Sequence, residues 1–167
     1  PGLNAFARFY RNESGIFRLV KTARTGLDAG GISGEAADLD GDGWLDLVLA
    51  ADPMNSSAGR KPEPERFQSR VFLNNGASAA DANHWLRLTF RGISDPELIG
   101  ARIEITANGK KQARWIHSNR AYKSGGALDV HFGLGNATHA DVTVVLPSGK
   151  THSFTNLPAD ESHQLHL

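Results

Sequence analysis

Four aspartates in one short segment restrict what the chain around them can fold into. They are Asp38, Asp40, Asp42 and Asp46, at positions 1, 3, 5 and 9 of a loop that reads Asp-Leu-Asp-Gly-Asp-Gly-Trp-Leu-Asp. Alternate residues of a curled loop can point toward one centre, and the two glycines allow the backbone angles that such curling needs. Without a cation, two carboxylates about 4 Å apart would repel by about 4 kcal/mol at an effective dielectric constant near 20. The spacing therefore predicts a metal site.

Calcium is the cation that suits this loop, because Ca²⁺ takes about six to eight oxygen ligands in a flexible shell. The predicted ligands are Asp38, Asp40, Asp42, Asp46 and the backbone carbonyl of Trp44 at position 7. An EF-hand would need a Glu at position 12, where this chain has Leu49, and the flanks read as apolar strand instead of amphipathic helix. We expect Ca²⁺ to be a structural cofactor that pins the loop. An acidic turn without metal is the alternative.

After residue 83 the chain is dominated by strand alternation. The predicted strands are Trp85–Phe90, Arg102–Thr106, Gln112–His117, Leu128–Phe132, Val142–Leu146, His152–Thr155 and His163–Leu167. Asn108-Gly109 predicts a tight hairpin, because both residues tolerate positive φ. Seven short strands with regularly spaced turns favour a β-sandwich. No stretch shows a helical period.

The first part of the chain contains a weak internal repeat. Phe9–Gly15 and Val71–Gly76 share an aromatic strand end, an Asn and a Gly turn, and Val71 follows Phe9 by 62 residues. That spacing suits one propeller blade with an insertion at Asp52–Arg66. The small, polar stretch Gly76–Asn83 marks a boundary. We predict an all-β protein in which a partial propeller blade with a calcium loop, residues 1–82, is packed against or linked to a seven-stranded β-sandwich, residues 83–167.

Two parts of the sequence resemble known families. Gly34–Leu47 resembles the FG-GAP/VCBS-type propeller repeat of integrin-α-like proteins, and Val71–Gly76 resembles the end of that repeat. From Asn83 onward the chain resembles the ASPIC/UnbV domain, which follows such repeats in bacterial exported proteins and in the cartilage acidic protein family. The segments that carry this second resemblance are Asn83–Leu88, Ile99–Ile103, His131–Gly135 and Pro147–Gly149. Ser118–Gly126 departs from the Gly-rich, Ser-Gln-containing stretch of that family.

The resemblance implies calcium-dependent folding and an extracellular binding or adhesion role. We therefore expect a secreted, cell-surface or periplasmic protein with an extracellular protein or a glycan as its partner. A closed propeller has about four to eight blades. The expected blade is thus either the last of a series, with upstream blades of the same protein as partners, or it packs on the sandwich.

Composition argues against several other functions. Lys+Arg and Asp+Glu number 18 each, so no basic field would attract nucleic acid. No apolar run approaches the ~18 residues needed to span a membrane. The chain has no cysteine, which excludes disulfides, thiol catalysis and zinc–thiolate sites.

Nothing in the sequence forms a catalytic motif, so we predict a protein that is not an enzyme. The seven histidines include no His-x-His pair and no His-Glu-x-x-His motif. Ser33 lies in a segment one residue short of a nucleophile elbow. Gly133-Leu134-Gly135 lacks the third glycine of a dinucleotide site, and we interpret it as a turn.

Trp115 and Tyr122 are the candidate ligand-binding residues. In the strand Gln112–His117, Ile116 and Trp115 lie on opposite faces, so Trp115 is exposed if Ile116 points into the core. An exposed Trp could stack on a sugar ring. Packing between the domains and burial in the core are the alternative locations for the Trp115 side chain. The alternative function is accordingly a carbohydrate-binding appendage of a larger polysaccharide-active protein.

Overall fold

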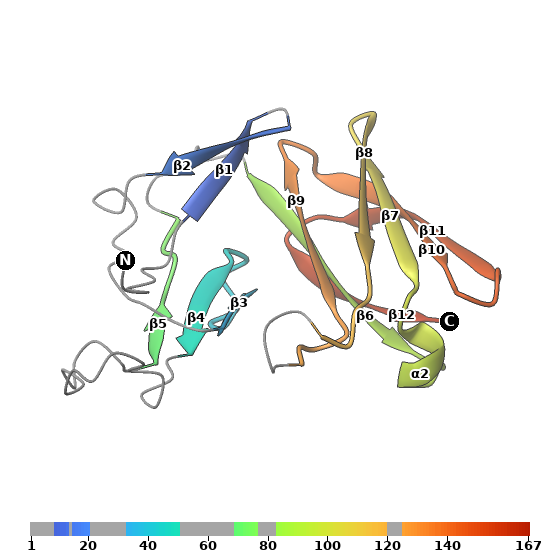
Figure 1. The fold of residues 1–167 in the computed structure, drawn as a ribbon. Helices are drawn as coiled ribbons and strands as arrows, with labels where there is room; N and C mark the ends of the chain where they lie inside the picture. The colour runs from blue at the N-terminus through green and yellow to red at the C-terminus, as the bar shows by residue number, and fades with distance from the viewer. Residues whose placement is uncertain (1–8, 14, 21–32, 51–68, 77–82, 120–124) are drawn as a thin grey trace. The chain divides into compact units, whose positions relative to one another are not determined.

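The computed structural model shows a β-rich chain (Figure 1). The residues it describes are 9–13, 15–20, 33–50, 69–76, 83–119 and 125–167. Within them lie twelve strands and one helix of four residues, so the predicted all-β class is confirmed. The chain divides into two compact units, residues 1–75 with 121–124 and residues 76–120 with 125–167. Each unit is described separately below.

The described strands of the first unit form two small sheets, and neither sheet is closed. The strands are β1 (Phe9–Glu13), β2 (Ile16–Val20), β3 (Ser33–Ala37), β4 (Asp46–Ala50) and β5 (Arg70–Phe72). β1 and β2 pair antiparallel around Gly15, whose φ is 90°. β4 lies between β3 and β5 in an antiparallel sheet. The propeller blade stays a prediction, and its expected insertion Asp52–Arg66 lies outside the described residues.

The second unit contains seven strands in two sheets. They are β6 (His84–Arg91), β7 (Arg102–Ala107), β8 (Lys110–Trp115), β9 (Val130–Gly135), β10 (His139–Val145), β11 (Thr151–Pro158) and β12 (Glu161–His166). One sheet has the order β11-β10-β7-β8 and is antiparallel; the other has the order β12-β6-β9, with β12 parallel to β6 (Figure 1). The predicted Asn108-Gly109 hairpin joins β7 to β8, with φ values of 47° and 72°.

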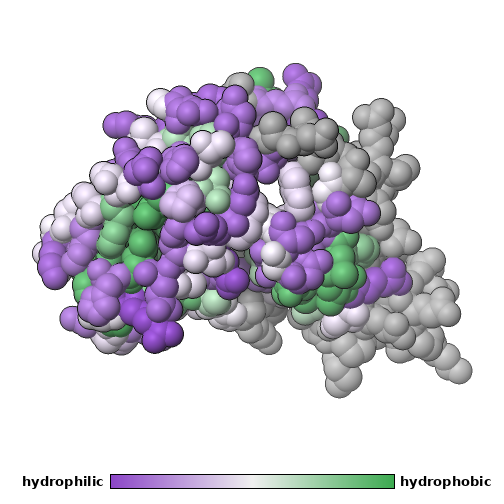
Figure 2. All heavy atoms as spheres, turned by 180° about the vertical axis from the view of Figure 1, so that it is seen from behind, coloured by the Kyte–Doolittle hydropathy of each residue, from purple (hydrophilic) through white to green (hydrophobic). Residues whose placement is uncertain are grey.

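Alternate residues of the central strands fill one core between these two sheets. The largest of the fully buried apolar side chains are Leu86, Leu88, Ile103, Ile105, Ile116, Phe132, Val142 and Val144. They come from both sheets and belong to one continuous cluster. Period-two alternation places the polar residues of the same strands on the outer faces. On the face seen in Figure 2, the described residues are mostly hydrophilic, with hydrophobic ones gathered in limited patches.

β8 is an edge strand, and this explains why neither of its faces is purely apolar. On its inward face Gln112 donates a hydrogen bond from Nε2 to the carbonyl of Gly133 in β9, at 2.7 Å. The Arg114 guanidinium lies 5.6 Å from the ring centroid of Phe132. β9 is itself an edge strand of the other sheet. These two contacts therefore link the edges of the two sheets with polar side chains.

A short helix, α2 (Asp95–Leu98), was not expected from the sequence. The carbonyl of Ser94 accepts hydrogen bonds from the N–H groups of Glu97 and Leu98, which closes the first turn. Glu97 reaches back with Oε2 to the Ser94 hydroxyl at 2.5 Å and to the Ser94 N–H at 3.3 Å. These hydrogen bonds lower the pKa of Glu97. Ser94-Asp95-Pro96-Glu97 matches a capping box with an early proline, a signal stronger than helical periodicity in so short an element.

The interpretation of Gly133-Leu134-Gly135 as a turn was wrong. These residues form the end of β9, and Leu134 is 7% exposed and belongs to the core. The chain leaves the strand only at Gly135, whose φ is 60°. The two glycines suggested a turn, although the alternation of the strand continues from Val130 through Phe132 to Leu134.

Candidate metal centre

The loop that joins β3 to β4 (the two strands are labelled in Figure 1) brings three of the predicted ligands together. Asp38, Asp40 and Asp42 each present one carboxylate oxygen, and these oxygens all lie within 4.8 Å of one another. Asp38 is partly buried, and the other two are exposed. The arrangement is the one expected for ligands at alternate positions of a curled loop.

Hydrogen bonds inside the loop hold this curl. The two oxygens of Asp38 accept the N–H groups of Gly41 at 2.8 Å and Gly43 at 3.2 Å. The Trp44 N–H donates to Asp42 Oδ1 at 2.8 Å. Gly41 and Gly43 have φ values of 81° and 88°, in the left-handed region that strains any residue with a Cβ. The glycines between the acids are thus needed for the backbone path itself.

Asp46 has a different place from the other three aspartates. It is 1% exposed, and it is the buried charged residue of the described chain. Its Oδ2 accepts the N–H of Leu39, and its Oδ1 accepts the N–H of Asn74 just after β5, both at 2.8 Å. Asp46 is not one of the three residues whose oxygens converge. It ties the start of the loop and the end of β5 to the start of β4.

Trp44, whose carbonyl was a predicted ligand, is partly buried and adjoins the cluster through its N–H bond to Asp42. The sequence identified all these loop residues, but it did not reveal that Asn74 contacts Asp46. Asn74 also donates from Nδ2 to the carbonyl of Leu45, at 3.4 Å. Its contact with Asp46 spans 28 positions along the chain, so no local pattern could have indicated it.

The donor chemistry of the loop fits a hard divalent cation. Three carboxylates supply oxygen ligands, which Ca²⁺ prefers over nitrogen or sulfur. An ionised carboxylate offers about four acceptor sites, so the N–H bonds accepted by Asp38 and Asp42 leave acceptor capacity for a metal. Within the described part of the chain, no Lys or Arg forms an ion pair with these three residues. Their mutual repulsion is thus not offset by a basic side chain there.

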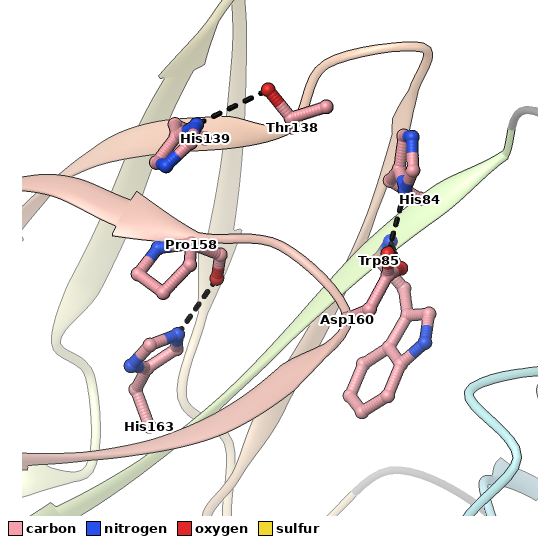
Figure 3. Close-up of polar contacts among 7 residues, drawn as sticks. All are labelled: His84, Trp85, Thr138, His139, Pro158, Asp160 and His163. Atoms are coloured by element: carbon pink, nitrogen blue, oxygen red, sulfur yellow. Dashed lines mark hydrogen bonds and ion pairs between the residues drawn. The ribbon is translucent and has the colours of Figure 1, made fainter.

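Three histidines of the second unit have hydrogen-bond partners among neighbouring residues (Figure 3). His84 Nδ1 lies 2.6 Å from Asp160 Oδ2, and this pair connects β6 to the turn between β11 and β12. His163 Nε2 lies 2.8 Å from the carbonyl oxygen of Pro158, and His139 Nδ1 lies 3.1 Å from the Thr138 hydroxyl. Among the described residues, the aspartate loop is the one group of three or more potential metal-binding side chains.

Trp115 and Tyr122 have different outcomes. Trp115, the last residue of β8, is 51% exposed, while Ile116 is fully buried. Trp115 is therefore not buried in the core. Its side chain is exposed, as the strand alternation allowed. Tyr122 lies outside the described residues.

Comparison with known families supports one of the two resemblances. Residues 92–166 match the family model described as ASPIC and UnbV. Apart from residues 121–124, the matched segment lies in the second unit, and it covers less than half of the 167 residues. A search of curated proteins finds no match. The helix that the structure describes, at four residues, is far too short to cross a bilayer.

Proposed function

We propose that this chain is a non-catalytic, exported binding or adhesion module in which one Ca²⁺ stabilises the loop between β3 and β4. The observation that carries the proposal is the convergence of the Asp38, Asp40 and Asp42 carboxylates within 4.8 Å. The Trp44 carbonyl and Asp46 complete the proposed ligand set. The unit that holds this loop is proposed to be an FG-GAP/VCBS-type propeller blade, by its resemblance in sequence.

A structural role for the ion follows from where the loop begins and ends. The loop joins two paired strands, and Asp46 connects it to Asn74 beyond the third. An ion bound by the three converging carboxylates would cancel their repulsion and fix the curl that leads into β4. Ca²⁺ would supply this charge neutralisation, while Asp46 accepts hydrogen bonds from its two backbone partners.

Export and a partner outside the cell are proposed from the same resemblance. An extracellular protein or a glycan is the expected partner, and upstream blades of the same protein are a further one. The absence of enzymatic activity is proposed because the histidines of Figure 3 are engaged with structural neighbours.

Calcium-dependent unfolding of the first unit tests the proposal. The chain has three tryptophans, and only Trp44 lies in the first unit. A Trp85→Phe, Trp115→Phe double variant therefore makes tryptophan fluorescence a reporter of the loop. We expect Ca²⁺ to raise the unfolding midpoint of this signal relative to excess chelator. At a free concentration of about 100 times the Kd, the gain would be about 2.7 kcal/mol.

Two further variants in this background identify the site. Asp42→Ala should abolish the calcium-dependent shift, because it removes one of the converging carboxylates. Glu161→Ala, which deletes an exposed acid on β12 in the second unit, should leave the shift unchanged. An equal shift in Asp42→Ala, or no shift in the parent, would contradict the proposal.

A further inference from the structure

The outer face of the four-stranded sheet in the second unit carries a compact group of polar side chains. Ile103 and Ile105 of β7 point into the core, so Arg102, Glu104 and Thr106 point outward. Directly paired residues lie on the same face of a sheet. The outward neighbours on the two adjacent strands are Lys111, Ala113 and Trp115 on β8, and Asp141, Thr143 and Val145 on β10.

A hollow of about 260 Å³ lies on this face. It is lined by Glu104, Thr106, Lys111, Gln112, Ala113, Asp141 and Thr143. Ala113 faces Glu104 across the strand pair, and its small side chain leaves the space that a larger residue would fill. Carboxylate, ammonium and hydroxyl groups thus surround a hollow small enough for part of a small ligand.

Trp115 adjoins this hollow along β8. It lies two residues after Ala113, on the same face, which corresponds to a step of about 7 Å along a strand. Its partner across the strand pair is Arg102, whose Nη1 lies 2.5 Å from Glu104 Oε1. Trp115 is 51% exposed. The aromatic surface of Trp115 is thereby placed beside Glu104, whose carboxylate is held by its ion pair with Arg102.

The mixture of charges restricts the class of ligand. Glu104 is paired with Arg102, so an anion in the hollow would chiefly meet the carboxylate of Asp141, and a cation would meet Lys111. A neutral polyhydroxyl molecule avoids both repulsions, because each hydroxyl can donate to a carboxylate and accept from an ammonium group. An exposed Trp adds the flat apolar surface against which the C–H face of a sugar ring can pack.

We infer that this face is a binding site for neutral oligosaccharides. Trp115 stacks on one sugar ring, and Glu104, Lys111, Asp141 and Thr143 hydrogen-bond the hydroxyls of a neighbouring ring that occupies the hollow above Ala113. The site lies within the second unit, apart in sequence from the aspartate loop. It therefore stands or falls independently of the calcium proposal, and binding should be unchanged when chelator replaces Ca²⁺.

The test uses an array of neutral and charged glycans, followed by titration of the best neutral hexasaccharide against the full chain. The intrinsic fluorescence of Trp115 reports binding in a Trp44→Phe, Trp85→Phe background. Affinity electrophoresis reports it for variants that lack Trp115. We expect Trp115→Ala to weaken binding by about tenfold and Trp115→Phe by less, because Phe keeps a stacking surface. Ala113→Phe should weaken binding by filling the hollow.

Thr151→Ala is the matched control, because Thr151 lies on the same outer face, opposite Val145 and away from the hollow. It should bind like the parent, and circular dichroism should show that all variants are folded. Failure of every neutral glycan on the array to bind would overturn the inference. Equal affinity of Trp115→Ala and the parent, or a preference for charged glycans, would overturn it as well.

Discussion

The two units of the chain bury very different kinds of residue. The second unit encloses seventeen apolar residues in one core. In the described part of the first unit, Leu49 is the buried apolar side chain and Asp46 the buried charged one. Of the eleven large hydrophobic residues that are exposed in the described part of the chain, nine lie in the first unit. Among the described residues, apolar packing holds the strands of the second unit, and directed polar contacts to Asp46 gather around the loop of the first.

This difference determines what each unit should be sensitive to. Apolar packing is nondirectional and depends on filled volume, so the second unit should respond mainly to cavities. The first unit depends on specific N–H groups reaching Asp46 and, in our proposal, on a cation. It should therefore respond to single carboxylates and to calcium, while the second unit should be indifferent to both.

The largest expected effect is Phe132→Ala in the core of the second unit. Phe132 is fully buried, and its removal leaves a cavity between the two sheets, so we expect a loss of about 3–5 kcal/mol in the free energy of unfolding. Urea unfolding followed by Trp85 fluorescence, in a Trp44→Phe, Trp115→Phe background, measures this loss. Leu73→Ala, which truncates a side chain 63% exposed in the first unit, should change stability little when Trp44 is the single tryptophan. A comparable loss in Leu73→Ala would contradict the difference between the two units.

Asp46→Ala should have the next largest effect, and it should act on the first unit alone. The substitution leaves the N–H groups of Leu39 and Asn74 without their acceptor, which costs about 1–3 kcal/mol. Because Asp46 bonds these backbone N–H groups directly and not through a cation, the loss should persist in excess chelator. Fluorescence of Trp44 as the single tryptophan reports it. Asp42→Ala is the contrasting variant: it also removes the acceptor of the Trp44 N–H, but most of its effect should depend on calcium and disappear in excess chelator. If both variants behave alike, Asp46 has no separate structural role.

The sequence was informative where structure is local. Alternation predicted all seven strands of the second unit, because each strand directs its apolar side chains toward the core. The Asn108-Gly109 hairpin followed from two residues that tolerate positive φ. The aspartate spacing likewise predicted the three carboxylates that converge, because the loop that brings them together is itself short.

Contacts between distant segments could not be predicted in this way. The bond from Asn74 to Asp46 and the pair between His84 and Asp160 join residues 28 and 76 positions apart. The same limit applies to the hollow beside Trp115, which depends on the register of β7 with β8 and β10. Strand alternation predicts which face a residue occupies but not which residues lie beside it on neighbouring strands.

Asp160→Gly removes polar contacts from the second unit, which depends mainly on apolar packing. Asp160 has a φ of 61° and accepts from the Trp85 N–H at 3.3 Å in addition to its contact with His84. The variant removes both side-chain contacts, while glycine, unlike aspartate, adopts this φ without strain, so we expect a net loss of at most about 1 kcal/mol. Thermal unfolding measures it. Asp160→Ala should lose more, because alanine keeps a Cβ at this φ and so gains no relief of strain; a smaller loss in Ala than in Gly would contradict this account.

The smallest effect concerns pH and again distinguishes the units. Hydrogen bonds from Ser94 lower the pKa of Glu97 below its ordinary value of 4.5 in the folded state. A carboxyl whose pKa is lowered by folding contributes stability that is fully present above its unfolded pKa and is lost as pH falls through the folded value. We therefore expect Glu97→Gln to lower the Tm of the second unit slightly at pH 7, with the difference from the parent disappearing as the pH is lowered below about 4.5. Since Glu97 lies in the second unit, the Trp44 signal of the first unit should show no such difference between parent and variant at any pH. A difference that persists at low pH would mean that Glu97 acts through something other than its charge.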